Sequence, residues 1–192
     1  MCLPKGQMKK NISLIDFGAG NLHSVYKAFK FIGANIEITK DIKVIEKSDI
    51  VVFPGVGAFG SAMESIKKNN LEEVIIKSAK SKKPFLGICV GMQLLFESSE
   101  ENPGVKGLSV LKGKVVKFKK AKKVPHIGWN DKYYFVHSYY VVPEDKSIIF
   151  GETEYDGERF TSIIKKDNLF AVQFHPEKSG EIGLELLRNI VQ

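Results

Sequence analysis

Residues 11–88 alternate between short apolar runs and longer amphipathic segments. The apolar runs predict buried strands at 11–17, 35–39, 50–53 and 85–88. The segments between them predict helices at 22–32, 42–47 and 58–80, the last one broken near Asn69-Asn70. Because strand–helix–strand connections give parallel pairing with helices on both faces, this alternation predicts a doubly wound parallel sheet.

The second half of the chain has a different pattern. After about Glu100, glycines separate short runs rich in Val, Ile, Phe and Tyr, which is typical of antiparallel strands. We expect these strands at 108–111, 115–118, 133–141, 148–150, 160–164 and 169–173, followed by an amphipathic helix at 181–191. The sequence therefore predicts one α/β domain over residues 1–192. Its sheet is expected to be flavodoxin-like, with a parallel N-terminal half and antiparallel additions in the C-terminal half.

Length and composition agree with a single domain and exclude several classes of protein. A chain of 192 residues can bury a full core, and no apolar run approaches membrane-spanning length. Residues 1–10 lack the apolar stretch of a signal peptide, and residues 1–8 are expected to form a flexible extension. The two cysteines, Cys2 and Cys89, cannot form a disulfide framework, which indicates a reducing, cytoplasmic setting. No Cys or His cluster has zinc spacing, so we expect no metal and no cofactor.

The net charge of +7 is concentrated in one segment. Seven lysines lie within a dozen residues, at positions 112, 114, 117, 119, 120, 122 and 123. Such a run is typical of a solvated face, and docking onto an acidic partner surface is the alternative. Nucleic-acid binding is not expected, because Phe118 is the only aromatic residue in the run and no nucleic-acid motif accompanies it.

The segment Gly87-Ile88-Cys89-Val90-Gly91 follows the fourth predicted strand and has the pattern of a nucleophile elbow with cysteine as the nucleophile. A tight strand-to-helix turn needs small residues on both sides of that nucleophile. The helix is expected to follow the turn, because Met92, Leu95 and Phe96 are at helical spacing. The turn would place the Cys89 thiol near a helix N-terminus, where thiolate is favoured. The Val90 N–H would point to where an oxyanion forms. The alternative is a buried cysteine between two packing glycines.

The segment Gly55-Val56-Gly57-Ala58-Phe59-Gly60 matches the dinucleotide-binding pattern Gly-x-Gly-x-x-Gly. It follows the third strand instead of opening the sheet, and Pro54 interrupts the passage from strand to turn. We therefore favour a glycine loop that brings backbone N–H groups close to a substrate. If the third and fourth strands are neighbours, Val56 and Gly57 can supply a second oxyanion donor opposite Val90.

The segment Gln173-Phe174-His175-Pro176-Glu177 offers a base for Cys89. A residue before proline adopts extended geometry, and side chains two apart in an extended chain point to the same side. His175 and Glu177 are therefore expected to project together, with the carboxylate fixing the imidazole tautomer. None of the other three histidines, His23, His126 and His137, is followed two residues later by an acid. For a lone histidine, a structural role would be the alternative.

These motifs together resemble the class I (triad) glutamine amidotransferases. The resemblance is carried by residues 16–21, 54–59, 87–95, 125–130, 135–139 and 175–179, which follow one another in the family's order. Within the family, the chain is most similar to the glutaminase subunits of the imidazole glycerol phosphate synthases of histidine biosynthesis. The glycine loop, the segment around Trp129 and Lys178-Ser179 point to this branch.

The resemblance implies a glutaminase mechanism without a cofactor. Cys89 would attack the side-chain amide of L-glutamine, His175 would move protons, and Glu177 would orient His175. The remaining roles implied by the resemblance are the oxyanion hole (Val56, Gly57, Val90), substrate binding (Gln93, Ser138, Tyr139) and the partner interface (Asn21, Lys178).

The resemblance also implies a partner. The ammonia would pass to a (β/α)8-barrel cyclase subunit in a heterodimer, which makes imidazole glycerol phosphate and AICAR. Three alternatives remain at this point: a paralogous glutaminase that serves a surface-sugar amidotransferase, a protease-like cysteine hydrolase, and a regulatory subunit without catalysis.

Overall fold

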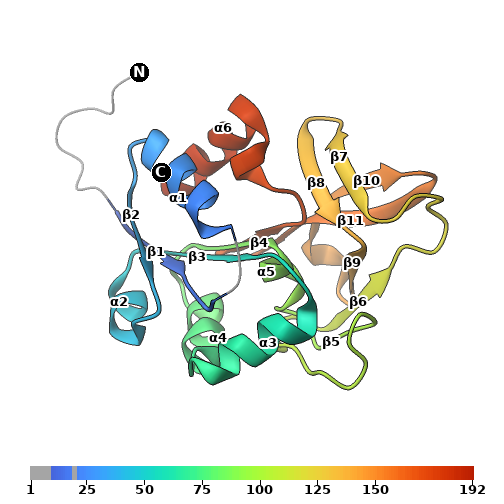
Figure 1. The fold of residues 1–192 in the computed structure, drawn as a ribbon. Helices are drawn as coiled ribbons and strands as arrows, with labels where there is room; N and C mark the ends of the chain where they lie inside the picture. Colours follow the sequence, from blue (N-terminus) through green and yellow to red (C-terminus); the bar gives the residue numbers. More distant parts are fainter. Residues whose placement is uncertain (1–9, 19–20) are drawn as a thin grey trace.

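The computed structural model describes residues 10–18 and 21–192, so the predicted extension at residues 1–8 lies outside the described residues. The strands form a ten-stranded sheet and a separate two-stranded hairpin. In Figure 1 the large sheet crosses the middle of the molecule, with helices above and below its left half.

The parallel half of the sheet is doubly wound, as predicted, and has the strand order β2-β1-β3-β4-β12. The strand expected at 169–173 among the antiparallel additions is β12, and that expectation is wrong on one side, because β12 pairs parallel to β4. Its strands are β1 (Asn11–Ile15), β2 (Asn35–Thr39), β3 (Ile50–Gly55), β4 (Phe85–Cys89) and β12 (Leu169–Val172). Every residue of β3 and β4 is buried. This is why both strands read as continuous apolar runs in the sequence: helices cover both faces of a parallel sheet.

Helices pack on the two faces of this parallel half. Helices α1 (Leu22–Phe31) and α6 (Gly180–Val191) lie on one face; α2 (Ile42–Lys47), α3 (Phe59–Lys68) and α4 (Glu72–Lys80) lie on the other (Figure 1). The predicted break near Asn69-Asn70 separates α3 from α4, and Asn70 has a φ of 56° there. Within residues 10–18 and 21–192, no helix has the length and apolar character needed to cross a membrane.

The antiparallel half extends the same sheet in the order β12-β11-β9-β6, with short β5 at the edge. Its strands are β5 (Ser98–Ser99), β6 (Gly113–Lys117), β9 (Tyr139–Pro143), β10 (Ile149–Tyr155) and β11 (Glu158–Lys166), where β10 pairs with β11. Strands β7 (His126–Asn130) and β8 (Tyr133–His137) form the separate hairpin. The predicted fold class is therefore confirmed.

Several predictions for this half are wrong. Short β5 was not predicted, and the strand expected at 148–150 is β10, which begins at Ile149 and continues to Tyr155. The single strand expected at 133–141 is divided at Ser138, so that β8 pairs in the hairpin and β9 pairs in the main sheet. Strand β7 was not predicted. The segment 108–111 is not a strand, because the N–H groups of Leu108 and Val110 donate to the carbonyls of Leu94 and Leu95 at 2.8 and 2.9 Å. Those bonds hold the segment against the turn that follows the elbow.

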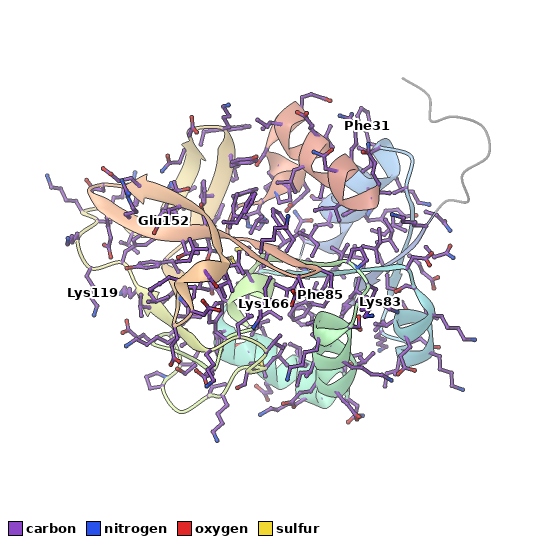
Figure 2. The ribbon with its side chains drawn as sticks, turned by 180° about the vertical axis from the view of Figure 1, so that it is seen from behind. Phe31, Lys83, Phe85, Lys119, Glu152 and Lys166 are labelled. Carbon is purple, nitrogen blue, oxygen red and sulfur yellow. The ribbon has the colours of Figure 1, made fainter. Side chains whose placement is uncertain are left out.

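The lysine-rich segment is held by backbone hydrogen bonds, and its lysines are exposed. The N–H groups of Lys119 and Lys120 donate to the Glu158 carboxylate at 2.8 and 2.7 Å. All seven lysines of the segment are exposed. Figure 2 shows Lys119 at the outer margin of the molecule, far from the core residue Phe85. This exposure agrees with a solvated face, and docking onto an acidic partner stays a prediction.

The start of α6 packs closely on the turn before it. A Cβ added at Gly183 would overlap the Pro176 carbonyl oxygen and lie 2.9 Å from Ser179 Cβ. We expect Gly183→Ala to lower the free energy of unfolding by about 1–3 kcal/mol, the typical cost of overpacking. Higher helix propensity opposes this by about 1 kcal/mol. Urea unfolding tests the change, with Glu185→Ala on the exposed face of α6 as the control. A stabilised Gly183→Ala variant would contradict the packing argument.

Candidate active site

Strands β3, β4 and β12 end side by side, at Gly55, Cys89 and Val172. Ligands of open α/β sheets bind beyond the carboxyl ends of the strands, and a pocket of about 450 Å³ lies there. Ten residues singled out from the sequence line this pocket: Asn21, Val56, Gly57, Cys89, Val90, Gln93, Ser138, Tyr139, His175 and Lys178. The fold thus gathers all the predicted site residues except Glu177, which lies behind His175.

The turn at Cys89 is as tight as the elbow pattern predicts. Cys89 has φ 53° and ψ −112°, a conformation that costs a residue other than glycine about 1–3 kcal/mol. A Cβ added at Gly91 would overlap the Phe53 carbonyl oxygen, and one at Gly87 would lie 3.1 Å from Ala171 Cβ. Gly91 is therefore needed for the elbow to fit against β3, whereas a side chain at Gly87 would require Ala171 to move by a few tenths of an ångström.

The helix expected after the elbow is only one turn long. Helix α5 covers Val90–Gln93, and the N–H groups of Leu95 and Phe96 bond three residues back, to Met92 and Gln93. The predicted helical spacing through Phe96 is therefore wrong; Leu95 and Phe96 are fully buried core residues outside the helix. A single turn has only a small macrodipole, so support for a thiolate has to come mainly from side chains.

His175 and Glu177 form the expected pair, by a different backbone route. His175 Nδ1 lies 2.8 Å from Glu177 Oε1, and the two side chains are 3% and 2% exposed. The backbone is not extended at Glu177: Pro176–Lys178 forms a single 3-10 turn, η2. Because Glu177 occupies Nδ1, the Nε2 atom of His175 is left for proton exchange.

The proton affinity of His175 is set by its neighbours. Burial lowers the pKa of the imidazole, but hydrogen bonding and the negative charges of Cys89 and Glu177 outweigh burial and raise the pKa to about 10. His175 is therefore protonated at neutral pH beside the sulfur. A cationic imidazole next to a cysteine is the environment in which thiolate nucleophiles occur.

Hydrogen bonds to strand β8 fix the position of His175. Its N–H donates to the Tyr134 carbonyl at 2.9 Å, and its carbonyl accepts from Ser179 Oγ at 2.7 Å. The Ser179 hydroxyl also accepts from the Tyr134 N–H at 3.0 Å. The Lys178 ammonium lies 5.8 Å from the centre of the Tyr134 ring, within cation–π range. The turn η2 is thus tied to the β7–β8 hairpin.

The glycine loop faces the elbow as expected. Gly55 is the register partner of Cys89, and a Cβ on Gly55 would lie 2.8 Å from the Gly91 nitrogen. Gly57 has a φ of +94°, a conformation that favours glycine. Val56 is 36% exposed and lines the pocket. This loop and Val90 therefore lie around the same cavity as the Cys89 thiol.

Sequence reasoning missed two groups in contact with the sulfur, which are the Val136 carbonyl, 3.9 Å from Cys89 Sγ, and the side chain of Gln173. Gln173 Nε2 donates to Cys89 Sγ at 3.6 Å, and Gln173 Oε1 accepts from Gln93 Nε2 at 3.0 Å. Gln173 is fully buried. The sequence did not signal this contact, because it depends on the pairing of β12 with β4.

Glu101 and His137 also line the pocket without having been assigned a role. Glu101 Oε2 accepts from the Phe59 N–H at 2.8 Å and thus holds the first residue of α3. Nothing near Glu101 in the sequence signals this contact, which joins residues 42 positions apart. Within the described part of the chain, no group of three or more His, Cys, Asp or Glu side chains could hold a metal ion.

Known proteins are similar to this chain in sequence, and solved structures are similar to it in fold. The chain is 48% identical to the imidazole glycerol phosphate synthase subunit HisH of Methanocaldococcus jannaschii, over 94% of this chain and 98% of that protein. It is 47% identical to the subunit of the same name from Aquifex aeolicus, over 92% and 93%. The structure of PurLQS from Thermotoga maritima has the same fold, with a TM-score of 0.67 at 16% identity, covering 95% of this chain and 98% of that one.

The sequence profile described as "Glutamine amidotransferase class-I" matches residues 13–192, which include the whole pocket. The elbow, the His175–Glu177 pair and the glycine loop all lie within the matched region. The chain therefore belongs to the class-I glutamine amidotransferase family.

Proposed function

We propose that this protein is a glutaminase that hydrolyses L-glutamine to L-glutamate and ammonia. The observation that carries the proposal is the placement of Cys89 and His175 in one pocket, with His175 Nδ1 held 2.8 Å from Glu177 Oε1. The pocket volume of about 450 Å³ suits a small-molecule substrate. The family assignment supports the same substrate.

The proposed reaction proceeds in two halves. The Cys89 thiolate attacks the carboxamide carbon, the C–N bond breaks, and His175 gives its Nε2 proton to the departing ammonia. Water then gives a proton to His175 and attacks the thioester, which releases glutamate and restores the thiolate. Glu177 holds the tautomer and position of His175 through both halves.

The other pocket residues are proposed to stabilise the oxyanions of the reaction and to bind the substrate. Backbone N–H groups of Val56, Gly57 and Val90 are proposed to stabilise the oxyanions of both halves. Gln93 is proposed to contact glutamine together with backbone groups of Ser138 and Tyr139. Gln93 uses its amide N–H groups on Tyr139 O and Gln173, so its own oxygen is the atom left for the substrate.

We further propose that the chain is the glutaminase subunit of an imidazole glycerol phosphate synthase. Its relatives bear that subunit name at 43% to 48% identity over nearly their whole length. The ammonia would pass to a (β/α)8-barrel cyclase in a heterodimer, which forms imidazole glycerol phosphate and AICAR for histidine biosynthesis.

The surface next to the pocket has the character of a docking face. Ile127 and Trp129 are each 60% exposed on β7, shortly after the pocket residue Pro125. Trp129 also reaches the start of α6, because a Cβ at Gly180 would lie 3.8 Å from its ring. Exposed aromatic residues are the usual anchors of protein interfaces. Asn21 and Lys178, at the pocket margin, are proposed to belong to this interface.

Replacing the nucleophile tests the reaction. We expect Cys89→Ala to reduce glutamate release from L-glutamine at least about a thousandfold, because the thioester of the proposed reaction forms on the Cys89 sulfur. A coupled glutamate assay in the presence of the cognate cyclase and its ligand measures this loss. The control is Ser61→Ala, an exposed position on α3. Turnover retained by Cys89→Ala would contradict the mechanism.

Replacing the orienting carboxylate tests the role of Glu177. In Glu177→Gln the charge that raises the His175 pKa is lost, so the imidazole should titrate below the value of about 10 expected for the native protein. NMR titration of the His175 ring nitrogens follows this change. Glutaminase kcat should fall about a hundredfold or more. An unchanged His175 titration would show that Glu177 is not its orienting group.

The docking face can be tested by two matched truncations. We expect Trp129→Ala to weaken binding of the cyclase at least about tenfold, the usual effect of losing a buried aromatic anchor. Phe31→Ala is the control, since Phe31 is 74% exposed at the far end of α1 (Figure 2). Titration calorimetry measures both. Tight binding of the cyclase by Trp129→Ala would exclude this face. Native protein that does not bind the cyclase would favour another ammonia acceptor, such as a surface-sugar amidotransferase.

A further inference from the structure

Two buried histidines near the pocket have no role in the proposed reaction. His126 Nδ1 on β7 lies 3.2 Å from His137 Nε2 on β8, and the residues are 2% and 6% exposed. The His126 ring stacks on Phe135 and Tyr155, with centroids 4.9 and 3.9 Å away. His137 lines the pocket. Such a pair of polar rings in an aromatic cluster is stable only if its hydrogen bonds are fixed.

The environment determines which nitrogens carry protons. Burial lowers the pKa of His126 to about 4. The pKa of His137 falls to about 3, mainly because the ring is buried. The hydrogen bond to Tyr139 raises this pKa, while electrostatic interactions with His126 and His175 lower it. Both rings are therefore neutral at pH 7. His137 Nδ1 lies 2.8 Å from the Tyr139 carbonyl, which can only accept, so Nδ1 carries the proton. Nε2 of His137 is then an acceptor, and His126 Nδ1 donates to it.

The same carbonyl fixes a second set of hydrogen bonds. Gln93 Nε2 donates to Tyr139 O at 3.0 Å and to Gln173 Oε1 at 3.0 Å. Gln173 then has its Nε2 directed at Cys89 Sγ, 3.6 Å away. The orientation of a side-chain amide is inferred from its hydrogen-bond partners. The Tyr139 carbonyl can only accept, so it fixes the amide nitrogen of Gln93, and that nitrogen in turn fixes the amide oxygen of Gln173. A flipped Gln173 would turn its oxygen toward the sulfur.

We propose that His126 and His137 are positioning residues that hold the Tyr139 carbonyl so that Gln93 and Gln173 direct an N–H at the Cys89 sulfur. This inference rests on the proposed role of Cys89 as the nucleophile. An N–H donor stabilises a thiolate more than a thiol. The network is therefore an uncharged support for the nucleophile, separate from His175 and Glu177. The strand β7 that carries His126 also carries the exposed Ile127 and Trp129.

Two substitutions of His137 distinguish positioning from packing. His137→Phe keeps a ring but removes both nitrogens, whereas the amide nitrogen of His137→Asn can replace Nδ1 as donor to Tyr139 O. The probe is iodoacetamide, with alkylation of Cys89 followed against pH in a Cys2→Ser background that leaves one thiol. For His137→Phe, we expect the midpoint of alkylation to rise by about one pH unit and kcat/KM to fall about tenfold, the effect of losing a hydrogen bond to a charged group. His137→Asn should restore most of both.

A matched control and a second variant make the test decisive. Tyr155→Phe keeps the stacking on His126 and removes a hydroxyl that donates to the Lys123 carbonyl, so its midpoint should equal that of the parent. Gln173→Glu, which puts an oxygen in place of the amide N–H, should raise the midpoint even if His137→Phe does not fold. The proposal would be overturned if folded His137→Phe, or Gln173→Glu, had the same alkylation midpoint as the parent protein. It would also be overturned if the midpoint and kcat/KM of His137→Asn were no closer to the parent values than those of His137→Phe.

Alkylation needs neither glutamine nor a partner, so the test separates this inference from the proposed function. A raised midpoint in His137→Phe, restored in His137→Asn, supports the positioning role even if the native protein releases no glutamate. Glutaminase activity with a midpoint that His137→Phe leaves unchanged overturns the positioning role while the proposed function stands.

Discussion

The pocket depends on the chain reversing direction at Cys89 immediately where β4 ends. That turn puts Cys89, a residue other than glycine, at a φ of 53°. It is possible only because Gly91 has no side chain, since a Cβ there would overlap the Phe53 carbonyl oxygen. Neighbouring strands hold the strained turn on both sides, β3 through Gly55 and β12 through Val172 and the Gln173 that follows. A backbone strain of this kind persists only where the surrounding structure determines it.

The electrostatics of the site follow from burial combined with pairing. His175, His126 and His137 are all buried, yet the pKa of His175 rises to about 10 while those of His126 and His137 fall to about 4 and 3. The difference is the partner: His175 faces the carboxylate of Glu177 and the sulfur of Cys89. His126 and His137 are paired with each other among aromatic rings and face no negative charge, and the positive charge of His175 lowers the pKa of His137 further. The same residue type therefore supplies a charged proton carrier on one side of the pocket and a neutral hydrogen-bonding pair on the other.

Sequence reasoning succeeded where the signal is local. The elbow, the glycine loop and the His175–Glu177 pair are each contained in a few consecutive residues, and the parallel sheet follows from a regular alternation. It failed to predict β7. It also predicted one strand at 133–141, where the apolar run before Ser138 is β8 of the hairpin and the run after it is β9 of the main sheet. It also extended α5 to Phe96, because buried core residues after a one-turn helix have the same apolar spacing as a longer helix.

The sequence by itself determined the doubly wound core, the tight turn at Cys89 and the identity of the candidate triad, because these depend on residue types at short spacing. Only the tertiary structure decided that Gln173 contacts the sulfur, that His126 pairs with His137, and that Glu101 holds the start of α3. These contacts join residues that are far apart along the chain. Their formation depends on strand register and on which carbonyls are left free to accept, neither of which is written in a local pattern.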